Sequence, residues 1–402
     1  MNTTTPPRSP RRRRALLALA ASLAVGASVV SACSYDAWAK PYDNVMEAVT
    51  ERLDSLVAAG YPAALASVTQ PDGSHTAVAA GLGDSATEEP ASADSEVRIG
   101  SNTKMFVATV VMQLVDEGRV DLDVPVETYL PGLVTGDGID GNDITVRALL
   151  QHTSGLPEYV DTIAEDAFAV QDNYIAPRDM LDIALERPAD AAPGAQWQYS
   201  NTNYVVLGLL VERVTQRTLA EQIQEGIAAP LGLSRTYLPD AGERTIRGEH
   251  PTSYHADTNG ELRSMTDMDT SYAWAAGAMV STPSELNTFM QALVGGKLVS
   301  DEASAQMQTT VAAGDELIPD AAYGLGMQAY PLSCGGVSWG HGGDIPGTQT
   351  RNAIGPDGTA VTIAVTALPW AVIDAEDEQA LLDGYRIVID ALDATLCDAV
   401  VA

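Results

Sequence analysis

One serine and one lysine, three residues apart, are the side chains of this sequence best placed for nucleophilic catalysis. Ser101 follows Gly100 at the end of a short apolar run, and Lys104 lies one turn into an apolar helix that stops near Gly118. Both side chains therefore share one helix face. The positive end of the helix favours an oxyanion near Ser101, and burial lowers the pKa of Lys104, so that a neutral lysine can accept the serine proton. The alternative is a helix-capping serine beside a solvated lysine.

A second pair of polar side chains precedes another apolar helix, expected over 205–214. Tyr199 and Asn201 lie two residues apart in a loop, from which both can point into one cleft. A phenol near a lysine ammonium has a depressed pKa and can act as a general base. An asparagine amide can donate to a substrate carbonyl and accept from a lysine. Taken alone, such a pair is more often a buried aromatic residue next to a helix cap.

A third group lies on or beside a strand near the C-terminus, where His341 is followed by Gly342 and Gly343. Two glycines let a substrate backbone pair closely with the strand edge. His341 can orient the leaving group or relay a proton. Alone, a histidine in a hairpin is the more common explanation, but the three groups together are far more specific than any one of them.

The order and spacing of the three groups resemble the Ser-x-x-Lys, Tyr-x-Asn and Lys/His-x-Gly motifs of the serine β-lactamases and penicillin-recognising DD-peptidases. The segments between them are similar too, for example 152–156 and 323–327. The resemblance covers residues 42–397. It is closest to the secreted actinobacterial D-alanyl-D-alanine carboxypeptidases, with class C β-lactamases beyond them. It implies an α+β fold of the β-lactamase/transpeptidase type and acyl-enzyme chemistry, and it says much less about the substrate.

The resemblance implies a role for each residue of the three motifs. Ser101 would attack a carbonyl carbon, with Lys104 and Tyr199 sharing the work of the base. Asn201 would hold the amide on the acyl side of the substrate, and His341 would support delivery of a proton to the leaving group. Water would then hydrolyse the acyl-enzyme.

The substrate would lie along the third-motif strand, beside Gly342 and Gly343. The oxyanion hole would use the backbone N–H of Ser101 and that of a second residue on this strand. We expect the second residue to be Thr348 or Gln349.

The sequence departs from the DD-peptidase pattern where those enzymes bind the substrate's terminal carboxylate. Their third motif usually reads His-Thr-Gly-Thr, whereas this chain has Gly342 and Asp344 at the threonine positions. Gln328 occupies the strand position at which we would expect an arginine. The carboxylate of Asp344 would repel a substrate carboxylate, unless Arg351 points inward and compensates. Four activities therefore stay open: a D-Ala-D-Ala carboxypeptidase or β-lactamase, an esterase, a D-amino-acid amidase or aminopeptidase, and a penicillin-binding sensor without turnover.

The elements around these residues indicate how they meet. We expect terminal helices over 42–59 and 376–394, and strands over 63–68, 77–82, 97–99, 324–329, 336–340, 347–354 and 360–367. The stretch between is mostly helical. The economical solution is one antiparallel sheet built from both chain ends and flanked by the terminal helices, with an inserted all-helical domain. This predicts a sheet domain at 42–100 and 275–402, a helical domain at 101–274, and a site in the cleft between them.

The N-terminus reads as an export signal. Residues 1–33 combine the basic run Arg11–Arg14 with an apolar stretch, and 30–33 resemble a lipobox in which Cys33 is lipidated. Secretion after cleavage at 37–39, with Cys33 discarded, is the alternative. In an exported protein, the two remaining cysteines, Cys334 and Cys397, are more often a disulfide than free thiols.

Composition narrows the partners. The 402 residues carry a net charge of −32, and 46% of them are hydrophobic. Such an acidic, globular chain repels nucleic acid and anionic lipid head groups, so membrane contact would come only through a lipid anchor. The histidines lack metal-binding spacing, and we expect neither a metal nor a cofactor. The expected partner is a small peptide, β-lactam or ester substrate, and the expected state is a monomer.

Overall fold

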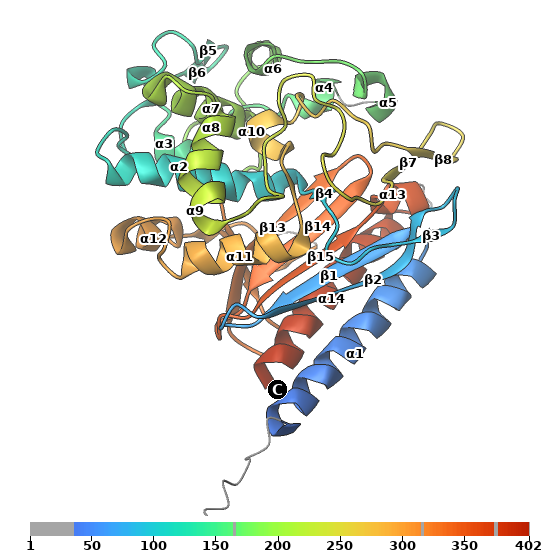
Figure 1. The fold of residues 1–402 in the computed structure, drawn as a ribbon. Coiled ribbons are helices and arrows are strands. Elements are labelled where there is room, and N and C mark those ends of the chain that lie inside the picture. Colours follow the sequence, from blue (N-terminus) through green and yellow to red (C-terminus); the bar gives the residue numbers. More distant parts are fainter. Residues whose placement is uncertain (1–35, 164–165, 315–316, 374–376, 402) are drawn as a thin grey trace, which may run out of the picture.

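A computed structural model describes residues 36–401, except 164–165, 315–316 and 374–376 (Figure 1). The expected signal peptide, including Cys33, lies outside the described residues. Within the described ranges, no helix combines the length and the apolar character needed to cross a bilayer.

Strands from both ends of the chain form one nine-stranded antiparallel sheet, which confirms the expected architecture. Its order is β10-β11-β12-β13-β14-β15-β1-β2-β3. The ends join where β1 pairs with β15, with Ala64 opposite Val365. The blue strands of the N-terminal part and the orange strands of the C-terminal part lie side by side in Figure 1. The strands are β1 (Ala63–Thr69), β2 (His75–Asp84), β3 (Glu89–Pro90), β10 (Val311–Ala312), β11 (Ala322–Tyr323), β12 (Gln328–Pro331), β13 (Val337–Ile345), β14 (Thr348–Ile354) and β15 (Ala360–Val365).

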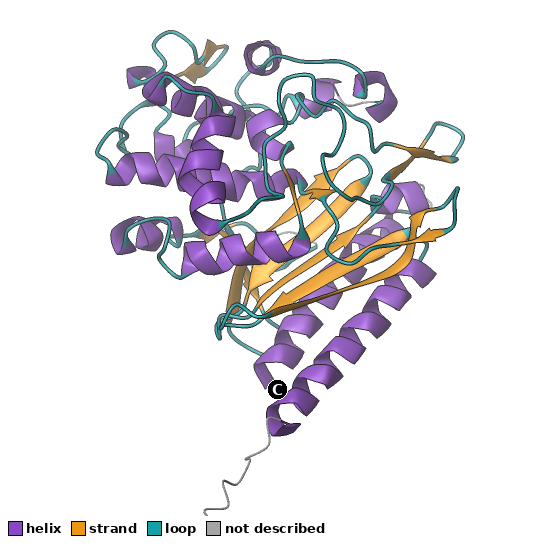
Figure 2. Cartoon of the chain, viewed as in Figure 1, coloured by secondary structure: helices purple, strands orange, loops and turns teal. Residues whose placement is uncertain are grey.

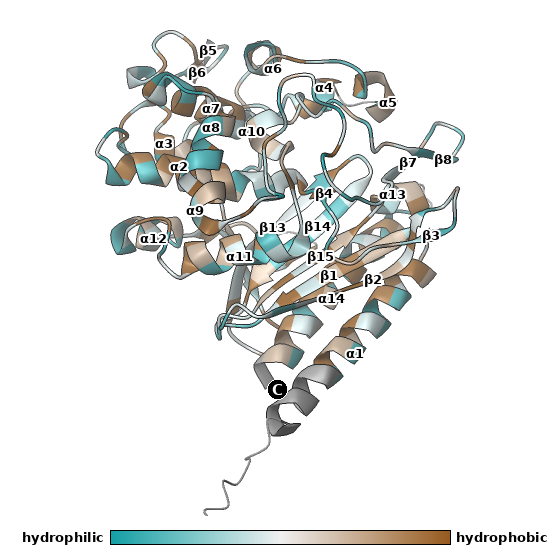
Figure 3. Ribbon diagram, in the orientation of Figure 1, coloured by the Kyte–Doolittle hydropathy of each residue, from teal (hydrophilic) through white to brown (hydrophobic). Residues whose placement is uncertain are grey.

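Helices cover both faces of this sheet. The terminal helices α1 (Asp36–Ala58) and α14 (Glu378–Val401) pack on one face, and α11 (Pro283–Val294) packs on the other (Figure 1). In α1 the buried residues Val45, Val49, Leu53 and Leu56 recur every three or four positions, as expected of an amphipathic helix. Figure 3 shows hydrophilic and hydrophobic colours alternating along both terminal helices.

The segment between the two halves of the sheet is mostly helical, but it is not all-helical as expected. It also carries two short hairpins, because turn residues interrupt its helical pattern (Figure 2). The hairpins are β5 (Thr135–Gly136) with β6 (Ile139–Asp140), and β7 (Tyr254–Ala256) with β8 (Leu262–Ser264). The helices are η1 (Gly100–Asn102), α2 (Thr103–Asp116), η2 (Val126–Thr128), α3 (Val146–Leu150), α4 (Val160–Ile163), α5 (Ala167–Val170), α6 (Pro177–Leu185), α7 (Thr202–Thr215), α8 (Leu219–Ile223), η3 (Gln224–Ala228), α9 (Ala229–Leu231) and α10 (Trp274–Gly277). Two short helices lie later in the chain, α12 (Asp301–Met307) and α13 (Pro369–Val372).

Two strands differ from the sequence prediction. The single strand expected over 324–329 is wrong, because Gly326 takes a left-handed backbone (φ +82°) that separates β11 from β12. Strand β13 is longer than expected and runs through the third motif, including His341. The third motif is therefore part of the sheet.

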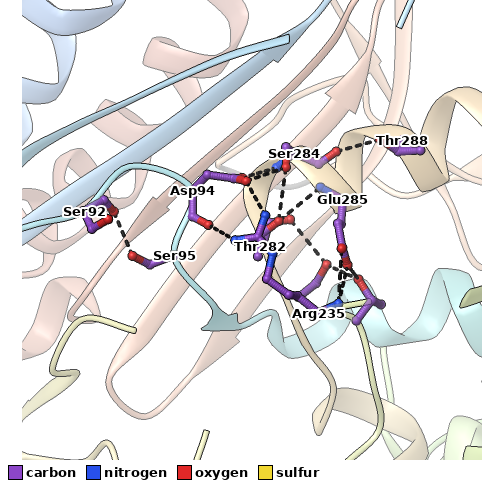
Figure 4. Close-up of polar contacts among 10 residues, drawn as sticks. Ser92, Asp94, Ser95, Arg235, Thr282, Ser284, Glu285 and Thr288 are labelled. Carbon is purple, nitrogen blue, oxygen red and sulfur yellow. Dashed lines mark hydrogen bonds and ion pairs between the residues drawn. The ribbon is translucent and has the colours of Figure 1, made fainter. Parts of the chain in front are cut away.

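A polar network fixes the segment that leads to Ser101 (Figure 4). The carboxylate of Asp94 accepts from the backbone N and the hydroxyl of Ser284 at 2.8 and 2.7 Å, and pairs with Arg235 at 2.6 Å. The Thr282 hydroxyl caps α11 by accepting from the backbone N of Glu285. The two-stranded sheet of β4 (Val97–Arg98) and β9 (Val280–Ser281) lies between this network and the nucleophile turn.

The expected disulfide is present. Cys334, in the turn between β12 and β13, is bonded to Cys397 on α14, 63 residues later. The bond ties the third-motif hairpin to the helix behind the sheet.

Replacing both cysteines by serine should lower the free energy of unfolding by about 2–4 kcal/mol, because the cross-link restricts the unfolded chain. Urea denaturation of the double variant, against wild type with and without reductant, measures the loss. Wild type that unfolds identically in reductant, or peptide mapping that finds two free thiols, would refute this contribution.

Candidate active site

Ser101 lies in the 3₁₀ turn η1, between β4 and α2. The turn presses directly on the backbone of β13, and glycine is required on both sides of the contact. A Cβ on Gly100, which has φ +52°, would lie 2.7 Å from the backbone N of Asp344. A Cβ on Gly343 would lie 2.0 Å from the carbonyl oxygen of Ile99. This close approach brings the nucleophile to the strand edge.

Lys104 is completely buried, and its amine contacts three oxygens. Nζ lies 2.9 Å from Ser101 Oγ, 2.7 Å from Asn201 Oδ1 and 2.7 Å from the carbonyl oxygen of Ala276. Burial lowers the pKa of Lys104 to about 7, and the nearby Glu158 acts in the opposite direction. A neutral amine fits these partners: its two N–H groups serve the two carbonyl oxygens, and its lone pair faces the serine hydroxyl.

Tyr199 completes the contacts of the nucleophile. Its hydroxyl donates to Ser101 Oγ at 2.8 Å, and its ring stacks on that of His152 with centroids 4.3 Å apart. The depressed pKa expected for this phenol is wrong. Burial raises the pKa of Tyr199 well above its ordinary value, although the Ser101 hydrogen bond acts in the other direction. Tyr199 is therefore a proton donor in the resting site.

Glu158 orients Asn201, a role that the sequence did not predict. Both the backbone N and the side-chain amide of Asn201 donate to Glu158 Oε2, at 2.7 and 3.0 Å. With its amide nitrogen turned this way, Asn201 presents its oxygen to Lys104. Burial raises the pKa of Glu158, and its hydrogen bonds from Asn201 and Val160 act in the opposite direction. One acid among 54 acidic residues carries no local signal that distinguishes it.

His152 holds the loop of the second motif through two hydrogen-bonding contacts. Its Nδ1 accepts from the backbone N of Ser200 at 3.2 Å and contacts the side-chain amide of Asn203 at 3.0 Å. With Nδ1 as acceptor, the ring proton lies on Nε2, which is 3.2 Å from the hydroxyl of Tyr323. Burial and the nearby Lys104 lower the pKa of His152 well below its ordinary value.

His341 accepts a hydrogen bond from that same tyrosine. Its Nδ1 lies 2.5 Å from the carbonyl oxygen of Gly342 and must donate, so Nε2 accepts from Tyr323 Oη at 2.9 Å. Burial lowers the pKa of His341 to about 3, which keeps the ring neutral. The ring lies behind Tyr199, with centroids 6.3 Å apart. His341 therefore contributes a neutral support to the site.

The third-motif strand offers its edge to the nucleophile. Strand β13 pairs with β12 only as far as Gly340, opposite Gln328, whereas its pairing with β14 continues to Ile345. The backbone N of Gly342 points to the open side, where it donates to the Gln328 side chain at 3.3 Å. By the alternation of an antiparallel strand, the N–H of Asp344 points to the same side.

Thr348 and Gln349 do not reach the nucleophile. Both lie on β14, the strand behind β13, and both are buried. Neither lines the hollows that open at Ser101. The open strand edge belongs to β13, whereas both residues expected to supply the second backbone N–H lie on β14.

Two hollows meet at Ser101, and both include Asn201 and Asp344. The first, of about 450 Å³, is mainly apolar. Its other walls include Tyr159, Val160, Ala167, Tyr272, Leu368 and Trp370. The second, of about 310 Å³, is polar. Its other walls include Tyr199, Gln328, His341, Gly342 and Arg351.

Asp344 and Arg351 form a two-pronged ion pair in the polar hollow. The guanidinium nitrogens lie 3.0 and 3.2 Å from the two carboxylate oxygens. Arg351 therefore points inward, the arrangement that the sequence left open. Asp344 raises the pKa of Arg351, against the effect of burial. Within the described residues, no group of three histidine, cysteine or acidic side chains is placed to hold a metal ion.

These features define a serine hydrolase on the β-lactamase/transpeptidase-like fold. The chain matches the beta-lactamase family over residues 45–386 and belongs to that family.

Solved structures of related proteins share the fold over most of the chain. A D-stereospecific amidohydrolase from Streptomyces sp. is 35% identical, with a TM-score of 0.75, covering 84% of this chain and 98% of that protein. A D-amino acid amidase from Ochrobactrum anthropi SV3 is 24% identical, with a TM-score of 0.75, covering 88% and 99%. The second likeness bears on the fold alone.

A curated relative matches a smaller share. A protein of Bacillus subtilis (strain 168) named "Putative penicillin-binding protein PbpX" is 26% identical over 266 residues. The match covers 66% of this chain and 60% of that protein. Protein flp of Staphylococcus aureus (strain N315) is 30% identical over 155 residues, which are 39% of this chain and 30% of that protein. The chain thus spans less than two thirds of the length of these curated relatives.

The Glu158→Gln variant should lower the pKa of Lys104 below about 7, because it removes the anion that favours the ammonium. The pH midpoint for labelling of Ser101 by a fluorophosphonate would move to lower pH. Glu186→Gln removes the same charge from an exposed position and serves as the control. A midpoint that stays in place, or rises, would contradict the electrostatic effect of Glu158 on Lys104.

Proposed function

We propose that this protein hydrolyses amide or ester bonds through an acyl-enzyme on Ser101, and that it acts as an amidase on D-amino-acid substrates. One observation carries the catalytic part: the buried Lys104 amine lies 2.9 Å from Ser101 Oγ, with its N–H groups already engaged by two carbonyl oxygens. The serine hydroxyl thus faces a base that is half deprotonated near pH 7.

In the first step, Lys104 takes the hydroxyl proton while Ser101 Oγ bonds to the carbonyl carbon. Negative charge moves to the carbonyl oxygen, and the N–H groups of Ser101 and Asp344 would stabilise it. This replaces the residues expected on β14, since the N–H of Asp344 lies on the open side of β13.

In the second step, the bond to the leaving group breaks. Tyr199 gives its hydroxyl proton to the departing nitrogen or oxygen, and the Lys104 ammonium returns a proton to the phenolate left behind. Both groups contact Ser101 Oγ in the resting site. Water then attacks the ester carbon with the same groups in reverse, and Ser101 regains its proton. Asn201 would hold the acyl side of the substrate from its place between the two hollows.

The choice of substrate class rests on two supports. The Streptomyces protein, whose description is D-stereospecific amidohydrolase, matches nearly its whole length. The mainly apolar hollow also suits an apolar acyl side chain. A D-Ala-D-Ala carboxypeptidase or β-lactamase is the second candidate, favoured by the penicillin-binding relative. An esterase and a penicillin-binding sensor without turnover are the remaining candidate functions.

We also propose export, with lipidation at Cys33 or secretion as the two routes. The disulfide supports this, because such bonds persist mainly in oxidising compartments.

Ser101→Ala should abolish hydrolysis and covalent labelling without unfolding the protein. A panel of a D-amino-acid amide, a D-Ala-D-Ala peptide, nitrocefin and p-nitrophenyl acetate ranks the candidates. Intact mass after β-lactam treatment identifies a sensor by its stable adduct. The control is Ser74→Ala, at an exposed position in the hairpin between β1 and β2. Hydrolysis that persists at full rate in Ser101→Ala would exclude the mechanism.

The value of kcat/KM should rise with pH and level off, with a midpoint near 7, as Lys104 loses its proton. Tyr199→Phe should slow the reaction by roughly 10²–10⁴-fold and keep this midpoint, because the phenol acts as an acid. Tyr174→Phe, where the tyrosine is 51% exposed, is the matched control. If the rise of kcat/KM with pH near 7 disappears in Tyr199→Phe, the base would instead be the phenol.

A further inference from the structure

In the mechanism proposed above, the leaving group would lie in the polar hollow. Tyr199, its proposed proton donor, lines this hollow and does not line the apolar one. The atoms beyond the breaking bond must therefore lie over Asp344 and Arg351. The chemistry of this ion pair decides which leaving groups fit.

The ion pair is built into the sheet. Arg351 reaches Asp344 from the neighbouring strand β14 by crossing the position of Gly342, where a Cβ would lie 2.9 Å from one guanidinium nitrogen. The guanidinium side chain is 7% exposed and the carboxylate 39% exposed. A third hydrogen bond, to the carbonyl oxygen of Thr350 at 2.8 Å, holds the guanidinium in place.

No other cation is available there to a substrate anion. Among the described residues that line the polar hollow, Arg351 is the one arginine, His341 is the one histidine, and no lysine is present. The His341 ring is neutral. Arginine binds carboxylates through two parallel N–H donors, and here both prongs already hold a carboxylate of the protein itself.

We propose that the Asp344–Arg351 pair excludes substrates whose leaving group carries a carboxylate, and restricts this protein to neutral leaving groups: ammonia from a primary amide, an uncharged amine, or an alcohol. The proposal rests on the acyl-enzyme function proposed above. An incoming carboxylate must either displace Asp344 or lie beside it, and in a partly dehydrated hollow two like charges repel strongly. A primary amide or ester brings no such charge.

The first test compares D-alanyl-D-alanine with D-alanyl-D-alaninamide and follows only cleavage of the bond between the two residues, from which D-alanine or D-alaninamide leaves. Wild type should hydrolyse the amide at least about tenfold better in kcat/KM, and Asp344→Ala should raise the acid-to-amide ratio by about tenfold or more. The gain should disappear in Asp344→Ala/Arg351→Met, because it needs the freed guanidinium. Asp182→Ala removes the same charge from an exposed pair with Arg178 and should leave the ratio unchanged.

The second test needs no turnover. Acetate should raise the melting temperature of Asp344→Ala, by filling the vacated carboxylate position, and should not raise that of wild type or the double variant. If the alanine variant fails to fold, Asp344→Asn keeps the shape and loses the charge, and the ratio test is made on it. Equal rates for acid and amide in wild type, or a ratio unmoved in a folded variant, would overturn the proposal. Hydrolysis that does not depend on Ser101 would instead overturn the proposed function and leave the acetate result standing.

Discussion

The burial of a single amine, that of Lys104, is the constraint on which the site depends. A lysine removed from water loses the hydration of its charge, and its pKa falls to about 7. The surroundings then have to satisfy two N–H groups and leave one lone pair for Ser101. Asn201 and the carbonyl of Ala276 do this. The second motif, through Asn201, and the segment before β9, through Ala276, therefore both supply acceptors for the Lys104 amine.

Each of these partners is fixed by a further contact. Glu158 sets the orientation of the Asn201 amide, and His152 holds the loop of the second motif while stacking on Tyr199. The direction of hydrogen bonding then runs from His152 through Tyr323 to His341, with each ring neutral. Of the lysine, the phenol and the two histidine rings, only Lys104 has a pKa near neutral pH, because burial moves the pKa values of the others away from it. This explains why the phenol can stay protonated as an acid while the amine alternates between its two states.

The sequence predicted the sheet from both chain ends, the terminal helices and the disulfide, because periodicity, turn residues and cysteine number are local signals. It also singled out Ser101, Lys104, Tyr199 and Asn201, which the fold brings within hydrogen-bonding distance. It could not predict Glu158, whose importance lies in a contact 43 residues away in the chain. It expected the second backbone N–H on β14 and not on the open edge of β13, because strand register depends on pairing and the glycines of β13 read as a strand end. The direction of the Tyr199 pKa was wrong because burial, which no local pattern displays, outweighs the hydrogen bond with Ser101.

Lys104 and Arg351, the two buried basic side chains of the site, have different roles because their chemistry differs. Lysine can lose its proton, so the fold buries Lys104 without an ionic partner in direct contact and obtains a base. Arginine cannot do so in a protein, so a buried guanidinium keeps its charge and needs hydrogen-bond acceptors. For Arg351 on β14 these acceptors include the anion Asp344 on β13. Arg351 can reach it because Gly342 has no side chain in the way. Paired in this way, the guanidinium is neutralised by the protein before any substrate arrives. The burial of Lys104 provides a base for the nucleophile. The pairing of Arg351 with Asp344 means that the polar hollow has no net positive charge with which to bind a carboxylate.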